Sequence, residues 1–182
     1  MAITIDSTPA LIVVDLQKGT LANPMVHDVG LVVANSVALI EAFRAKGWPI
    51  ALANVDGTAP GRNSYGPGGR EFPPAWSELV AELGQQPTDI STTRRSWDSF
   101  ATTGLHDDLA ARGVTQVIIV GVATSFGVES TARAAYDLGY NVIVVLDAIT
   151  DMRLEAHENS VERIFPVLGE VGTAEEVLAA IG

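Results

Sequence analysis

The sequence predicts an α/β fold, a three-layer αβα sandwich with a central parallel sheet, from three observations. Short apolar runs without polar alternation are typical of parallel strands that are buried on both faces. Segments with helical periodicity and recognisable ends lie between these runs. The chain has 182 residues, of which 47% are hydrophobic, and this suffices for one substantial core. We therefore expect residues 1–182 to form a single domain.

Six apolar runs are expected to form the strands. In chain order they are ALIVVD (10–15), PIALANV (49–55), TDIST (88–92), QVIIVGV (116–122), NVIVVLDA (141–148) and a weaker LGEVG (168–172). Because helical segments separate them, the strands are expected to join through right-handed βαβ units, with helices on both faces of the sheet.

The helix between the first two strands has clear ends. Asp28 has the side chain of a good N-cap, and Gly47 can adopt the left-handed conformation that ends many helices. The same reasoning ends two later helices at Gly113 and Gly139. The buried face of the first helix is expected to carry Val33, Val37, Ile40 and Phe43.

A C-terminal helix and a long loop complete the expected elements. Thr173 and Glu176 have the spacing of a capping box at the start of AEEVLAAI. Residues 57–75, GTAPGRNSYGPGGREFPPA, are so rich in glycine and proline that they must be irregular. Loops of this length are usually functional or disordered, and the sequence leaves both alternatives open.

Net charge and composition exclude several classes of function. The chain has 11 basic and 22 acidic side chains, so its formal net charge is −11, which repels nucleic-acid phosphates and anionic lipids. No basic region precedes the first apolar run, and no run is long enough to span a membrane. We therefore expect a cytoplasmic protein without nucleic-acid or membrane partners. The absence of cysteine excludes disulfides, thiolate metal sites and a thiol nucleophile.

Polar residues at the ends of predicted strands mark a candidate site, because ligands of open parallel sheets bind beyond the carboxyl ends of the strands. Asp15 follows four buried apolar positions, where desolvation is costly, and this indicates a charged partner and a tuned pKa. The alternative for Asp15 is a simple cap of a loop or helix. Arg94 follows the third strand and is either part of the site or a solvated surface residue.

The turn from Ala123 through Thr124 to Gly127 follows the fourth strand and begins a helix. Free N–H groups at a helix start attract negative charge, and a glycine lets a substrate approach the backbone closely. This turn is therefore expected to bind an anionic group of the substrate. For Gly127 the alternative is ordinary packing of the helix on the sheet.

Three further side chains lie close to these positions in the sequence. Trp97 and Phe100 follow Arg94 and are expected either to form an apolar wall of the site or to pack in the core. Gln17 lies two residues after Asp15 and is expected to orient Asp15 or the substrate.

Three long segments resemble one known family. They are VVDLQKG (13–19), RRSWDSFATTGLHDDLAARGVTQVIIVGVATSFGVESTARAAYDLGYNVIVVLDAITD (94–151) and EAHENSVERIFPVLGEVGTAEEVLAAI (155–181). They resemble the isochorismatase-like hydrolases, a superfamily that also contains nicotinamidases and N-carbamoylsarcosine amidases. The resemblance covers nearly the whole chain except the 57–75 loop. It implies a Rossmann-like sheet of six parallel strands, a homo-oligomer, and a cis peptide bond between Val122 and Ala123.

The amidases of this superfamily use an Asp, a Lys and a Cys, and the resemblance places Asp15, Arg94 and Gly127 at these positions. Only the Asp is retained. Attack by a thiol is excluded, since neither Gly127 nor any other residue supplies one. Ser125 lies two residues before the nucleophile position and Ser130 most of a helical turn after it, so neither is expected to replace the thiol.

Nicotinamidases also bind a metal through an Asp and two His after the second strand. The corresponding segment of this chain, NVDGTAPGRNS, contains Asp56 but no histidine. The three histidines, His27, His106 and His157, lie in other segments without ligand spacing. We therefore expect no metal and no other cofactor.

Isochorismatases proper have a glycine at the Cys position and hydrolyse a vinyl ether, a reaction that needs a general acid but no covalent nucleophile. The resemblance thus implies a small-molecule hydrolase in which Asp15 donates a proton. Arg94 would be an electrostatic clamp suited to a substrate carboxylate, and Gly127 would be part of an anion cradle. The alternative is a catalytically silent member that binds a metabolite or acts as an oligomeric scaffold, because two of the three catalytic positions differ.

Overall fold

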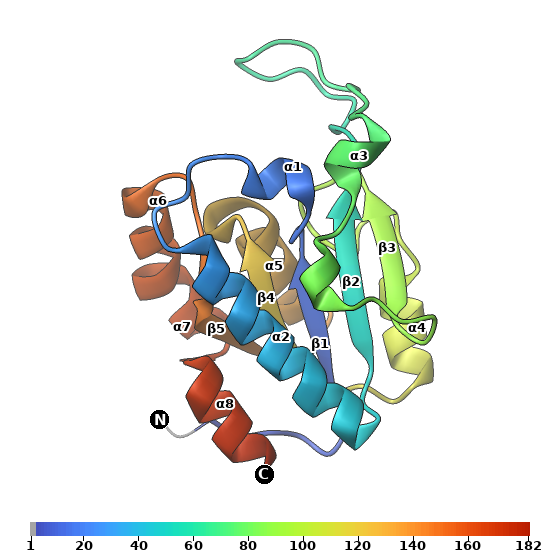
Figure 1. Cartoon of the computed structure of the whole chain (residues 1–182), viewed down its shortest axis with the longest axis vertical. Coiled ribbons are helices and arrows are strands. Elements are labelled where there is room, and N and C mark those ends of the chain that lie inside the picture. The colour runs from blue at the N-terminus through green and yellow to red at the C-terminus, as the bar shows by residue number, and fades with distance from the viewer. Residues whose placement is uncertain (1–2) are drawn as a thin grey trace.

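In the computed structural model, which describes residues 3–182, six parallel strands form one sheet between two layers of helices (Figure 1). The strand order is β3-β2-β1-β4-β5-β6. The strands are β1 (Pro9–Val14), β2 (Ile50–Val55), β3 (Ile90–Arg94), β4 (Gln116–Val122), β5 (Asn141–Thr150) and β6 (Glu170–Gly172). The predicted α/β sandwich with a six-stranded parallel sheet is thereby confirmed.

Helices α2 and α8 cover one face of the sheet, and α4, α5 and α7 cover the other (Figure 1). The α-helices are α1 (Lys18–Leu21), α2 (Val29–Lys46), α3 (Pro74–Ser77), α4 (Leu105–Ala111), α5 (Glu129–Asp137), α6 (Leu154–Asn159), α7 (Phe165–Leu168) and α8 (Ala174–Ile181). The shorter helical turns are η1 (Ala81–Leu83), η2 (Thr124–Val128) and η3 (Ser160–Ile164). Within residues 3–182, no helix has the length and apolar character needed to cross a membrane.

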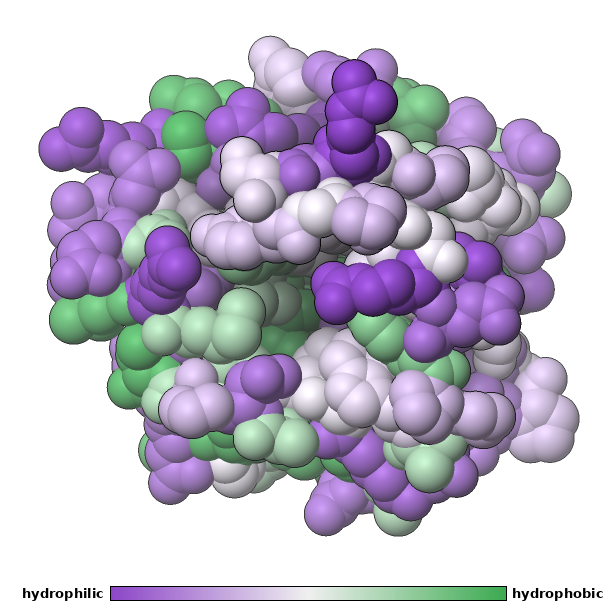
Figure 2. Space-filling view, turned by 90° about the horizontal axis from the view of Figure 1, so that it is seen from above, coloured by the Kyte–Doolittle hydropathy of each residue, from purple (hydrophilic) through white to green (hydrophobic). Residues whose placement is uncertain are grey.

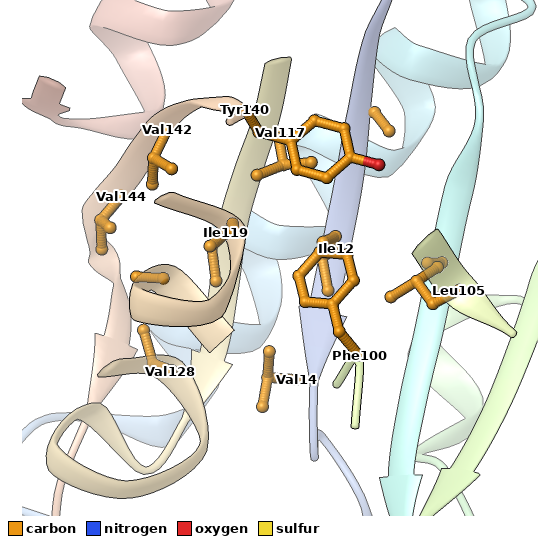
Figure 3. Close-up of a cluster of buried hydrophobic side chains, with 14 of the residues drawn as sticks. Ile12, Val14, Phe100, Leu105, Val117, Ile119, Val128, Tyr140, Val142 and Val144 are labelled. Carbon is orange, nitrogen blue, oxygen red and sulfur yellow. The ribbon is translucent and has the colours of Figure 1, made fainter. Parts of the chain in front are cut away.

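The central strand β1 contributes to both cores, because successive side chains of a strand point to opposite faces. Leu11 and Val13 pack with α2, whereas Ile12 and Val14 belong to the cluster on the opposite face (Figure 3). All six residues of the strand are buried. This explains why β1 appears in the sequence as a continuous apolar run.

The predicted helix ends are confirmed. The Asp28 side chain accepts a hydrogen bond from the N–H of Gly30 at 2.8 Å, and Gly47 ends α2 with a φ of +69°. Thr173 and Glu176 form the expected capping box at the start of α8.

The buried face of α2 differs in part from the prediction. Its buried residues are Val32, Ser36, Leu39, Ile40 and Phe43. Val33 and Val37 are only half-buried and lie at the edge of this face. The mainly apolar sequence of α2 offers two adjacent stripes of helical periodicity, one through Val32 and one through Val33, and only packing against the sheet decides which is buried.

Two further predicted boundaries are affected by tertiary contacts. The third strand extends two residues beyond its predicted end, so that Arg94 is its last residue and pairs with Val55 of β2. The carboxyl end of β3 was missed in the sequence because its residues are polar, although Thr92 and Arg94 are buried in the structure. The loop predicted as irregular over residues 57–75 contains no helix or strand as far as Pro73, apart from isolated bridges, but its last two residues begin α3.

Candidate active site

A cavity of about 600 Å³ opens at the carboxyl ends of β1, β3 and β4. Seen from this end, the molecule is hollowed at its centre, with apolar surface inside the hollow and both hydrophilic and apolar residues around its rim (Figure 2). Four residues that the sequence predicted for the site line this cavity: Asp15, Trp97, Ala123 and Gly127. The other predicted site residues, Arg94, Gln17, Phe100 and Thr124, do not line it.

The backbone turns sharply at Asp15, directly after β1. Its φ of +50° lies in the left-handed region, which Asp tolerates better than most residues do. Its N–H donates to the carbonyl of Ala53 on β2 at 2.9 Å. The residue is only 7% exposed, and a carboxylate buried to this degree requires a partner.

Arg94 is that partner, and it reaches past the end of β2 to contact Asp15. Nη1 donates to Oδ1 at 2.7 Å, and Nη2 donates to Oδ2 at 3.0 Å. Nε and Nη2 also donate to the carbonyls of Asp98 and Trp97, each at 2.9 Å. The expectation of a clamp on the substrate is therefore corrected. The fully buried guanidinium uses its donors on Asp15 and the backbone and has no contact with the cavity.

The environment of Asp15 shifts the titration of its carboxyl to higher pH. Burial raises the pKa of the carboxyl above its ordinary value, and the charge and hydrogen bonds of Arg94 oppose this rise without cancelling it. The group therefore retains a proton to higher pH than an exposed aspartate does, and this property suits a general acid.

Gly127 leaves open space beside one oxygen of this carboxyl. A Cβ atom at position 127 would lie 3.1 Å from Oδ2 of Asp15 and 2.9 Å from Cγ1 of Val14. Both distances are shorter than ordinary van der Waals contacts, so a side chain here would press on the carboxyl and cover it. The glycine therefore keeps Oδ2 uncovered on the side of the turn.

The turn before α5 contains the expected cis peptide bond between Val122 and Ala123. Ala123 lines the cavity, and its N–H has no hydrogen-bond acceptor among residues 3–182. Thr124 was predicted to contact the substrate, but it is fully buried and lies outside the cavity. Its hydroxyl forms a hydrogen bond with Nδ1 of His157 at 2.9 Å, which satisfies a polar group that has no access to water.

Gln17 and Phe100 also have positions that differ from those expected for site residues. The Gln17 amide accepts from the N–H of Val55 at 2.8 Å and donates to the carbonyls of Val55 and Trp76 at 2.9 and 3.3 Å. It therefore joins β2 to α3. Phe100 is 7% exposed and stacks on Tyr140 in the core, as its packing alternative predicted (Figure 3).

Aromatic residues and the long loop form the cavity walls. Trp97 is 60% exposed and packs edge to face against Phe126, with 4.9 Å between the ring centroids. The 57–75 loop contributes Arg70 and Phe72, among other lining residues. Its glycine and proline content predicted a site loop as one of two alternatives. No sequence signal distinguished these lining residues individually, because the loop has no regular periodicity.

The histidines and Asp56, which were considered as metal ligands, contact other side chains instead. Asp56 pairs with Arg95 at 3.3 Å. His27 and His157, which are far apart in the sequence, have ring centroids 4.5 Å apart. Burial and the neighbouring His27 lower the pKa of His157, whereas the Asp151 charge opposes this effect. Within the described part of the chain, no three His, Cys, Asp or Glu side chains group as metal ligands.

Comparison with known proteins gives consistent matches. The Isochorismatase domain matches residues 9–176 of this chain. The isochorismatase family protein YwoC of Bacillus subtilis (strain 168) is 37% identical over 179 residues, which cover 94% of this chain and 93% of YwoC. The structure of an isochorismatase family protein from Burkholderia thailandensis superposes with a TM-score of 0.94 and 37% identity, over 100% of this chain and 99% of that one.

A relative with a named activity is also similar. The ureidoacrylate amidohydrolase RutB of Pseudomonas syringae pv. syringae (strain B728a) is 30% identical over 169 residues, which cover 76% of this chain and 69% of RutB. The domain match spans most of the chain, and the fold agrees with that of the similar structure. The chain therefore belongs to the isochorismatase family of hydrolases.

Proposed function

We propose that this chain hydrolyses a vinyl ether, or a related C–O or C–N bond, in a small molecule, with Asp15 as general acid and no covalent nucleophile. One observation supports this most. A buried carboxyl with a raised pKa lies at a cavity beside Gly127, in a chain that has no cysteine. RutB is an amidohydrolase, but cleavage of an amide by a thiol is not available to this chain.

For a vinyl ether, protonated Asp15 donates its proton to the terminal vinyl carbon, and the π electrons of the double bond form the new C–H bond. The ether oxygen stabilises the resulting cation as an oxocarbenium ion. Water adds to this ion and loses a proton to the Asp15 carboxylate. The hemiketal then separates into an alcohol and a carbonyl compound, so that Asp15 ends the cycle protonated.

In this mechanism the groups around Asp15 have supporting roles. Arg94 holds the carboxyl in place and limits the rise of its pKa. The N–H of Ala123 is available to a negatively charged substrate atom, since it has no acceptor among residues 3–182. Trp97 and Phe126 offer an apolar wall that excludes water from one side of the substrate.

Asp15→Asn tests the proposal directly. It keeps the size of the side chain but removes the acid, so turnover of an enol ether is expected to fall by about 10²- to 10⁴-fold. The assay incubates purified protein with a panel of enol ethers and amides. Asp56→Asn, at a half-exposed carboxylate paired with Arg95, is the control and is expected to retain turnover. Full activity of Asp15→Asn would refute the role of Asp15. Binding without turnover by the unmodified protein would favour a silent member of the family.

A further inference from the structure

The guanidinium of Arg94 is held from two sides. On one side it contacts both carboxyl oxygens of Asp15, and on the other it contacts the carbonyls of Trp97 and Asp98. These two carbonyls belong to the segment that directly follows β3. The position of Arg94 against Asp15 therefore depends on the shape of this segment as well as on the strand.

The Asp98 side chain determines that shape. Its Oδ1 accepts hydrogen bonds from the N–H groups of Phe100 at 2.7 Å and Ala101 at 2.6 Å. The Ser96 hydroxyl donates to the carbonyls of Asp98 and Ala101 at 3.0 and 3.2 Å. A carboxylate that accepts two N–H groups closes the turn, since hydrogen bonds to a charged acceptor are short and strong. The same turn places Trp97 in the wall of the cavity.

We propose that Asp98 is a positioning residue that, by folding the turn over residues 96–101, fixes Arg94 against Asp15. Asp98 itself does not line the cavity. It acts through the carbonyls that hold Arg94, and Arg94 in turn controls the protonation of Asp15. The kinetic consequence rests on the function proposed above, but the geometric claim does not.

The charged groups around Asp15 make its titration a specific readout. Arg94 faces it from β3, and Arg70 and Arg95 share the cavity with it. The turn after β4 faces it with Ala123 and Gly127, which carry no charge. Loosening Arg94 therefore raises the pKa of Asp15 further, because the group that opposes the effect of burial is weakened.

Two substitutions separate geometry from charge. Asp98→Asn and Asp98→Ala both remove the negative charge, which by itself lowers the pKa of Asp15 slightly. Asn retains an oxygen that accepts the N–H groups of Phe100 and Ala101, whereas Ala retains none. The difference between the two variants therefore reports the effect of the turn alone.

The experiment follows the Asp15 carboxyl carbon by NMR through a pH titration without substrate. Asp98→Ala is expected to raise the Asp15 pKa by about half a unit or more relative to Asp98→Asn. Asp28→Ala removes a comparable capping carboxylate from α2 and is expected to leave the Asp15 titration unchanged. Asp98→Ser, which keeps one short acceptor, is expected to give an intermediate shift and replaces the Ala variant if that variant does not fold.

Equal titration of Asp15 in Asp98→Ala, Asp98→Ser and Asp98→Asn would overturn the proposal. Because no substrate is needed, this result is independent of the proposed function. A shift in titration together with no turnover of any enol ether would support the role of Asp98 while contradicting the function proposed for Asp15.

Discussion

We propose that Gly127 determines how closely a substrate can approach Asp15. Gly127→Ala would place a Cβ atom 3.1 Å from Oδ2, at a backbone conformation that alanine can adopt. We expect kcat/KM to fall on the order of 10²-fold, since small displacements in a catalytic site can have effects of this size. Gly104→Ala, where a Cβ would meet nothing within 4 Å, is the matched control. Retained activity in Gly127→Ala would show that Oδ2 does not need this space.

Arg94 and Asp15 form a buried pair that is expected to matter for stability as well as for chemistry. Arg94→Ala leaves the Asp15 carboxyl and the carbonyls of Trp97 and Asp98 without their donor. The free energy of unfolding is expected to fall by about 3–5 kcal/mol, as for other broken buried pairs. Urea unfolding measures this, with the exposed Arg112→Ala as a control that is expected to change stability by less than about 0.5 kcal/mol. Equal stability of the two variants would contradict this account.

The sequence predicts which strand ends border the cavity better than it predicts which side chains line that cavity. Asp15 and Gly127 were expected at one site because both follow parallel strands, and the structure brings them together. The prediction for Gln17 did not foresee that its amide bonds the backbone of Val55, because these residues are 38 positions apart in the chain. Thr124 was misplaced for the same physical reason, since its partner His157 comes from a distant helix.

At the scale of elements, the 57–75 loop forms a wall of the cavity that depends on close backbone contacts. A Cβ at Gly68 would lie 2.0 Å from the carbonyl oxygen of Ala59 and 2.4 Å from that of Gly61. Gly68→Ala must therefore displace the loop. A displaced loop that weakens substrate binding by about 1 kcal/mol raises KM roughly fivefold. The melting temperature should change little, since this part of the loop is largely exposed.

A matched substitution lies in the same loop. A Cβ at Gly61 would meet nothing within 4 Å, so Gly61→Ala is expected to leave KM unchanged. Steady-state kinetics of the two variants on one substrate therefore separate a displaced wall from a general effect of alanine in the loop. Similar KM values for the two would indicate that the loop does not contact the substrate.

At the scale of the whole molecule, the lowered pKa of His157 links stability to pH. Below the ordinary histidine pKa of about 6.5, the unfolded chain binds a proton at this residue more readily than the folded chain does. Unfolding then takes up protons, so stability falls as the pH drops from this value through the lower folded pKa. His157→Gln is expected to reduce this loss of stability between pH 7.5 and pH 5.5.

Urea unfolding of both proteins at the two pH values tests this prediction. The raised pKa of Asp15 acts in the opposite direction, but it cancels when the variant is compared with the unmodified protein. His106→Gln, on α4, serves as the control. If the free energy of unfolding depends on pH identically in His157→Gln and in the unmodified protein, His157 is not the source of the loss of stability at low pH.

The outermost strand on the β3 side of the sheet is secured at both of its ends. Arg94 ties the carboxyl end of β3 across its neighbour to Asp15 in the middle of the sheet. At the other end, Asp89, directly before Ile90, pairs with Arg44 of α2 at 2.8 Å. Opening of this edge from either end must therefore break an ion pair as well as backbone hydrogen bonds. Asp15 is in this way one of the two anchors of the edge strand, besides the chemical role proposed for it.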